Sequence, residues 1–124
     1  MTKMFVIIGA ISGFLSVALG AFGAHGLNDK LSEHFMAIYQ TGVQYQMYHS
    51  LSLLLIGILA IQWRNCAKLR WSGYLMIVGI ILFSGSLYAL SLTGITWLGA
   101  ITPLGGTALL VGWFLLGLAA YRNS

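Results

Sequence analysis

The sequence predicts an all-α integral membrane protein, a four-helix transmembrane bundle with a short amphipathic helix on its outer side. The 124-residue chain is 59% hydrophobic and only 6% charged, whereas a soluble domain carries roughly 25% charged residues. Its apolar residues form long continuous runs, and a helical span needs about 20 such residues. Because the runs do not alternate with polar residues, a membrane β-barrel is excluded.

A single transmembrane domain is expected to cover residues 1–124. The expected spans are residues 4–24, 43–63, 71–92 and 98–120. The first run follows Lys3 and resembles a signal peptide. It is longer than the ~7–15 apolar residues of a signal sequence, and similar runs follow it, so it is interpreted as a retained helix.

The long polar connection, residues 28–42, predicts a short amphipathic helix lying at the lipid surface. Leu31, Phe35 and Ile38 recur at helical spacing and therefore share one face. Asn28 is a suitable residue to cap the start of this helix. The alternative that periodicity leaves open is a water-exposed extension of the second span.

The basic residues predict the orientation of the chain. All but Lys30 lie on one side of the four-span arrangement: Lys3, Arg64, Lys68, Arg70 and Arg122. Basic residues flanking spans stay in the cytoplasm, so both termini are expected to be cytoplasmic. These charges are too scattered to follow a phosphate backbone, so the expected partner is the lipid bilayer and not nucleic acid.

Hydrogen-bonding residues concentrate in the outer halves of all four spans. The candidate ligand-binding residues, here called the outer polar cluster, are His25, Gln46, His49, Ser84, Tyr88 and Thr102. Unpaired polar groups are costly in hydrocarbon, so these side chains are expected to face one another. The result is either a shallow polar cavity that opens outward or a dry, hydrogen-bonded helix interface.

Two histidines lie within or beside the spans, where ionisable residues are functional candidates. His25 and His49 are expected at similar depth. They could share a metal, relay protons, or simply be satisfied by neighbouring groups. No further ligand has suitable spacing, and Cys66 is the chain's single cysteine, so no metal and no cofactor is predicted.

Small residues predict close helix packing. In the first span they recur at spacings of three or four: Gly9, Gly13, Ser16, Gly20 and Gly23. Such residues let helix backbones approach closely, within the chain or in a dimer. At the start of the fourth span, Pro103 with Gly105 and Gly106 predicts an irregular helix entrance.

Four ordered motifs carry a resemblance to a known family. They are LGAFGAHGL from Leu19, QTGVQYQMYH from Gln40, FSGSLY from Phe83 and TPLGG from Thr102. The chain resembles the small bacterial inner-membrane proteins grouped as domain-of-unknown-function family 423, to which small eukaryotic transmembrane proteins are similar. The resemblance implies four membrane helices and a location in the bacterial cytoplasmic membrane, and it implies no established activity.

Three functional hypotheses follow. The first is binding of a small polar molecule, a lipid headgroup or a proton at the outer polar cluster, in a transport-related role. The second is a structural or adaptor role, in a homo-oligomer or against a larger membrane protein. The third is an enzyme acting on lipid with His49 as base. This hypothesis ranks last because the sequence supplies neither a nucleophile nor an electrostatic stabiliser.

Overall fold

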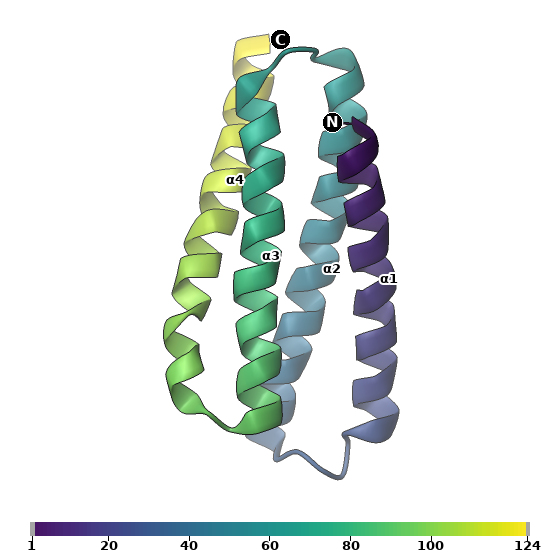
Figure 1. The fold of residues 1–124 in the computed structure, drawn as a ribbon, viewed down its shortest axis with the longest axis vertical. Coiled ribbons are helices and arrows are strands. Elements are labelled where there is room, and N and C mark those ends of the chain that lie inside the picture. Colours follow the sequence, from purple (N-terminus) through teal and green to yellow (C-terminus); the bar gives the residue numbers. More distant parts are fainter. Residues whose placement is uncertain (1, 124) are drawn as a thin grey trace.

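The computed structural model describes residues 2–123, and these form an all-α bundle (Figure 1). The elements are α1 (Thr2–Gly26), α2 (Glu33–Gln62), α3 (Ala67–Thr93), the 3₁₀ helix η1 (Thr96–Ala100) and α4 (Thr102–Asn123). The helices run up and down in chain order, and each packs mainly against the next. The predicted four-helix bundle is confirmed.

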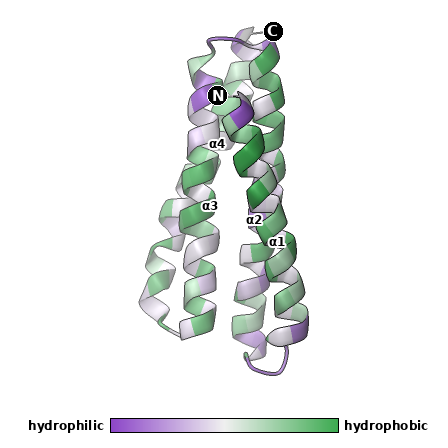
Figure 2. Ribbon diagram, turned by 45° about the vertical axis from the view of Figure 1, so that its right-hand side comes forward, coloured by the Kyte–Doolittle hydropathy of each residue, from purple (hydrophilic) through white to green (hydrophobic). Residues whose placement is uncertain are grey.

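The two ends of the bundle hold different parts of the chain. One end holds both chain termini and the α2–α3 connection (Figure 1), and it is called the inner end. The opposite, outer end holds residues 27–32 and η1. Figure 2 shows the strongest hydrophilic colours near the chain termini and in the α1–α2 and α2–α3 connections, with hydrophobic residues along the helices between them.

Among residues 2–123, three stretches are long and apolar enough to cross a membrane, namely Thr2–Gly26, Ala67–Thr93 and Thr96–Arg122. The remaining helix, α2, has a more polar first half. It lies between α1 and α3 and packs against both, so its polar side chains find partners on neighbouring helices. At about 1.5 Å per residue, each of these segments exceeds the ~30 Å hydrocarbon core.

The prediction of a separate amphipathic helix at residues 28–42 is wrong. Residues 28–32 form a turn, and the segment after it is the beginning of one continuous helix, α2. The residue that caps this helix is Ser32, not Asn28, because the Ser32 hydroxyl accepts the Phe35 amide at 3.2 Å. Gly42 does not interrupt the helix; its missing side chain leaves room for Tyr88 of α3.

Replacing Ser32 with alanine should fray the first turn of α2, because the Phe35 amide would lose its acceptor. Loss of an N-cap costs about 1 kcal/mol, which corresponds to roughly fivefold faster exchange of the Phe35 amide hydrogen. Hydrogen exchange checks this. Thr41→Val is the matched control, since the Thr41 hydroxyl bonds only to the Ala37 carbonyl of its own helix. Unchanged exchange in Ser32→Ala would contradict this role.

The backbone is irregular just before α4, whereas Pro103, Gly105 and Gly106, where the irregularity was predicted, lie within the helix. Gly94 ends α3 in the left-handed conformation at φ 74°, where its amide donates to the Leu90 carbonyl. Glycine adopts this conformation without steric penalty. The chain then forms η1 before Pro103, which stands in the first turn of α4 where its missing N–H does no harm.

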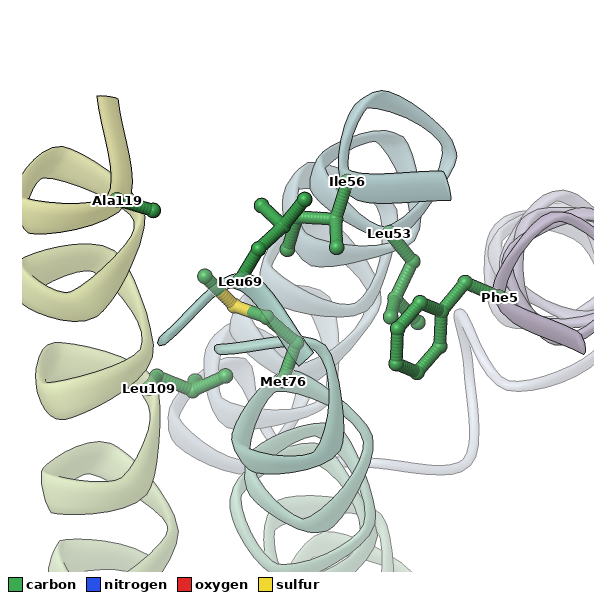
Figure 3. Close-up of a cluster of buried hydrophobic side chains, with 7 residues drawn as sticks. All are labelled: Phe5, Leu53, Ile56, Leu69, Met76, Leu109 and Ala119. Atoms are coloured by element: carbon green, nitrogen blue, oxygen red, sulfur yellow. The ribbon is translucent and has the colours of Figure 1, made fainter. Parts of the chain in front are cut away.

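Apolar packing holds the inner half of the bundle together. Figure 3 shows side chains from all four helices pointing toward one another: Phe5, Leu53, Ile56, Leu69, Met76, Leu109 and Ala119. Gly73 permits this packing, because any side chain there would collide with the Phe5 ring. Toward the outer end the α1–α2 and α3–α4 pairs diverge (Figure 2), and an aliphatic groove of about 390 Å³ lies between α1 and α3.

Candidate functional site

The outer polar cluster does not form one site in the structure. Its members fall into separate groups on different faces of the helices, and most of them bond directly to a neighbouring helix. Within residues 2–123, every buried side-chain nitrogen or oxygen has a hydrogen-bond partner. The cluster residues therefore act first as contacts between helices, which is the dry interface that the sequence left as one alternative.

Gln46 is the centre of the largest group. Its side chain is buried, and its Nε2 donates to the Ser12 carbonyl of α1 at 2.9 Å. Its Oε1 accepts a short hydrogen bond from the Tyr88 hydroxyl of α3. The Ser50 hydroxyl completes the group, at 2.7 Å from the Ser12 hydroxyl. One amide side chain thus joins three helices.

Single side-chain bonds to backbone carbonyls extend this pattern. Ser84 of α3 donates to the Gly42 carbonyl at 2.7 Å, and Ser16 of α1 donates to the Val43 carbonyl at 2.9 Å. The buried Tyr39 hydroxyl donates to the Leu19 carbonyl. Thr102 lies elsewhere, at 2.6 Å from the Ser86 hydroxyl between α3 and α4. These polar residues are satisfied without any ligand.

His25 and His49 lie at different depths. His25 is exposed in the last turn of α1, at the outer end. His49 lies near the middle of α2, level with the Ser12–Ser50 contact, which is roughly 18 Å along the bundle axis from His25 at 1.5 Å per residue. The expectation of similar depth is wrong because α2 begins well before the apolar run from which its start was predicted.

The small residues of α1 face α2. Side chains at Gly9 or Gly23 would press on Ser50 and Leu53 or collide with the Tyr39 ring, and Gly20 lies against Val43. Gly13 is different, since a Cβ there would touch only Ser50, at 4.0 Å.

In α4, Gly105 and Gly106 also differ from each other. A side chain at Gly105 would strike the α3 backbone at Phe83, whereas one at Gly106 would make an ordinary contact with the Phe83 ring. Of the small residues predicted to pack, Gly105 therefore lies against a neighbouring helix backbone, whereas Gly106 does not need to be glycine for packing.

The partners of His49 identify its protonation state. Its Nδ1 lies 2.7 Å from the Tyr45 carbonyl, which can only accept, so Nδ1 carries the hydrogen. Its Nε2 accepts from the Trp113 indole at 3.0 Å. Both ring nitrogens are occupied in the neutral form, so a proton on Nε2 would break the contact with α4. No group of three or more metal-ligating side chains occurs among the described residues.

His49 lies at the base of a second cavity, here called the aromatic chamber. The chamber has a volume of about 470 Å³ and is lined by Tyr45, Tyr48, His49, Phe83, Gly106, Leu109, Leu110 and Trp113. The Tyr45 ring stacks on Phe83 at 4.8 Å between centroids, and His49 meets Trp113 edge to face at 5.8 Å. Because Tyr48 and Trp113 are 54% and 44% exposed, the chamber opens on the surface of the bundle.

Sequence reasoning missed most of this chamber. Tyr45, Tyr48 and His49 share one helical face, and that spacing was an available signal. Trp113 was a further signal, because tryptophan usually lies at the membrane interface and this one is near the middle of α4.

The fold defines a small polytopic membrane protein built from four packed helices. More particularly, the chain belongs to the family described as Protein of unknown function (DUF423), whose profile matches residues 19–106. It is 49% identical to the UPF0382 membrane protein YwdK of Bacillus subtilis, with 97% of this chain and 98% of that protein covered.

Staphylococcal relatives agree. The chain is 48% identical to a UPF0382 membrane protein of Staphylococcus epidermidis and 46% identical to UPF0382 membrane protein SAB0533 of Staphylococcus aureus. Each alignment covers 97% of both chains. No solved structure matches the chain. The family is therefore one of uncharacterised membrane proteins.

Proposed function

We propose that this membrane protein binds a neutral, lipid-soluble ring compound bearing carbonyl groups, of the quinone class, in the aromatic chamber. One observation carries the proposal. Tyr45 and Tyr48, near the middle of α2, line this open cavity, and neither phenol hydroxyl bonds to another residue that the structure describes. The buried polar side chains elsewhere in residues 2–123 are all satisfied.

The energetics of a hydroxyl in lipid support a ligand that accepts hydrogen bonds. An unpaired hydroxyl in hydrocarbon costs on the order of a few kcal/mol. The Trp113 indole N–H is already donated to His49. The two phenols are then the donors left to a ligand, and carbonyl oxygens are suitable acceptors for both.

The lining of the chamber supports a flat and uncharged ligand. No Lys, Arg, Asp or Glu side chain of the described residues lines it, and a charged group would be costly at this depth. The stacked pair Tyr45 and Phe83 offers ring faces on one side, and Trp113 offers another. Aromatic rings favour offset stacking, and a volume of about 470 Å³ lies within the range of small-molecule sites.

The other hypotheses have less support. The glycine stripe that suggested an adaptor is largely used inside the chain, because Gly9, Gly20 and Gly23 face α2. A proton relay between His25 and His49 would have to cross about 18 Å along the bundle. Binding in the aromatic chamber needs neither feature.

The proposal also includes the membrane in which the protein lies and the orientation of its termini. Membrane insertion with both termini in the cytoplasm is supported by the basic residues at the inner end, including Lys68 and Arg122, against Lys30 alone at the outer end. A bacterial cytoplasmic membrane agrees with the bacterial membrane proteins to which the chain is similar.

Quinone binding is testable by fluorescence. Trp63, Trp71 and Trp97 are replaced by phenylalanine, which leaves Trp113 as the emitter, and the protein in lipid nanodiscs is titrated with a decyl-substituted benzoquinone. Saturable quenching is expected. Tyr45→Phe combined with Tyr48→Phe should weaken the apparent affinity about tenfold, since it removes two hydrogen bonds of about 0.5–1.5 kcal/mol each.

Tyr74→Phe is the matched control, because Tyr74 of α3 packs against Phe5 and Trp71 away from the chamber. It should leave the titration unchanged. Linear quenching without saturation, or equal affinity in the double variant and the parent, would refute quinone binding in the chamber.

A further inference from the structure

Two further hollows lie along α1 and α2, away from the aromatic chamber, and are here called the outer and the inner section. The outer section is a polar pocket of about 350 Å³, lined by Gly20, Gly23, Ala24, Tyr39, Gln40, Val43 and Gln44. The inner section begins about a helical turn deeper. It has a volume of about 640 Å³ and is lined by Gly9, Ala10, Gly13, Phe14, Val17, Ala18, Met47, Ser50, Leu51 and Leu54. Together the two sections are called the α1–α2 furrow.

Missing side chains keep the furrow open. Gly13 lines its inner section, and a Cβ at this position would meet only Ser50, at 4.0 Å. Gly20 lines the outer section, where a Cβ would press on Val43 at 3.3 Å and extend into the hollow's edge on α2. From Gly20 to Gly9 the furrow follows α1 for about 16 Å at 1.5 Å per residue, close to half of the ~30 Å hydrocarbon core.

The outer section of the furrow offers uncharged groups that form hydrogen bonds. Gln40 and Gln44 are one helical turn apart, both are exposed, and neither carboxamide bonds to another residue that the structure describes. A carboxamide both donates and accepts hydrogen bonds, as hydroxyl groups do. No charged side chain of the described residues lines this pocket, and the Tyr39 hydroxyl is already bonded to the Leu19 carbonyl. Uncharged hydroxyl groups are therefore the best complement.

We infer that the α1–α2 furrow holds one bilayer lipid whose headgroup carries hydroxyls, of the glycerol or sugar type. The headgroup meets Gln40 and Gln44 at the outer end, and an acyl chain follows the apolar section past Gly13 toward the middle of the bilayer. The order of the two sections matches a lipid in one leaflet, with its polar end at the interface and its chain pointing inward. The residues involved do not line the aromatic chamber, so this inference stands apart from quinone binding.

Native mass spectrometry tests the inference. The protein is reconstituted in bilayers with equal amounts of four lipids: monoglucosyl-diacylglycerol, phosphatidylglycerol, phosphatidylcholine and phosphatidic acid. It is then released into the gas phase and the retained lipid is identified. Preferential retention of the glucosyl and glycerol headgroups is expected, because both carry free hydroxyls. Retention that follows negative charge, or that is equal for all four lipids, would overturn the inference.

Variants separate the headgroup from the chain. The double variant Gln40→Leu with Gln44→Leu should bind the hydroxyl-bearing lipids about tenfold more weakly, because two hydrogen bonds to the headgroup are lost. The preference for these lipids over the others should then disappear. Gln62→Leu, at the other end of the same helix and also exposed, is the control. Gly13→Leu should fill the inner section and reduce retention of every lipid, whereas Gly117→Leu enters open space and should not.

The fold of each variant is checked by its thermal unfolding. Variants that stay folded yet retain the glucosyl lipid like the parent would overturn the inference. This result would be independent of the outcome of the quinone titration, because quenching is scored in the chamber and lipid retention in the furrow.

Discussion

Replacing Gly105 with alanine should destabilise the bundle by about 3 kcal/mol, at the upper end of the usual cost of overpacking. A Cβ at this position would lie 2.8 Å from the Leu82 carbonyl carbon and from the Phe83 Cα, and closer still to the Phe83 amide nitrogen. These are backbone atoms of α3, so no rotamer change relieves the collision. The helices α3 and α4 would have to move apart.

Unfolding in mixed micelles of a mild detergent and dodecyl sulfate measures this loss. Gly106→Ala is the matched control one residue away, since its nearest neighbour would be the Phe83 ring at 3.7 Å. Gly117→Ala meets nothing within 4 Å. Both controls should unfold like the parent, or slightly later, because alanine favours a helix interior over glycine by about 0.5–1 kcal/mol. If all three variants lost the same stability, close approach at Gly105 would not be the cause.

Much of the fold was predictable from the chain. Apolar composition and run length predict the spans because a bilayer imposes a fixed thickness and demands satisfied backbone groups. The start of α2 was not predictable in this way. Its first turns are held by the Ser32 cap and by burial of Tyr39 against Gly23 of α1, and neither contact follows from hydropathy.

For the candidate site, the sequence predicts which polar residues lie in the outer half but not which of them contact one another. The sequence indicates that polar residues gather in the outer half, but pairing depends on which faces meet across helices. Gln46 is separated from Ser12 by 34 residues and from Tyr88 by 42, and no local pattern connects them. The two histidines were linked in the prediction by assumed depth alone, and a shift in the start of α2 was enough to separate His49 from His25.

The chamber and the furrow illustrate the same limit. Each depends on space that is left between helices, and a one-dimensional pattern does not report space. Gly9 and Gly13 lie on the same helix and line the same hollow, yet a Cβ at Gly9 would press on the Ser50 carbonyl at 3.0 Å, whereas one at Gly13 would meet only Ser50, at 4.0 Å. Spacing alone predicts the same role for both residues.

Replacing Gln46 with leucine should cost about 2 kcal/mol, because the partly buried Tyr88 hydroxyl loses its acceptor and α1 loses its side-chain contact from Nε2. Single interhelical hydrogen bonds in membranes contribute about 0.6 kcal/mol on average and about 1.7 at most. A larger total is expected here since one side chain joins three helices. Gln44→Leu, two residues away and exposed, should leave the free energy of unfolding unchanged.

A double-mutant cycle isolates the bond between α2 and α3. Tyr88→Phe alone should cost about 1 kcal/mol, but in the Gln46→Leu background it should carry no cost, because the phenol then has no acceptor left to lose. Some of the Gln46→Leu penalty is an orphaned hydroxyl, so removing that hydroxyl should recover stability in the double variant. Strictly additive losses in the same micellar unfolding assay would mean that Gln46 and Tyr88 stabilise the bundle independently, and that the diverging outer halves of the helix pairs are held by other contacts.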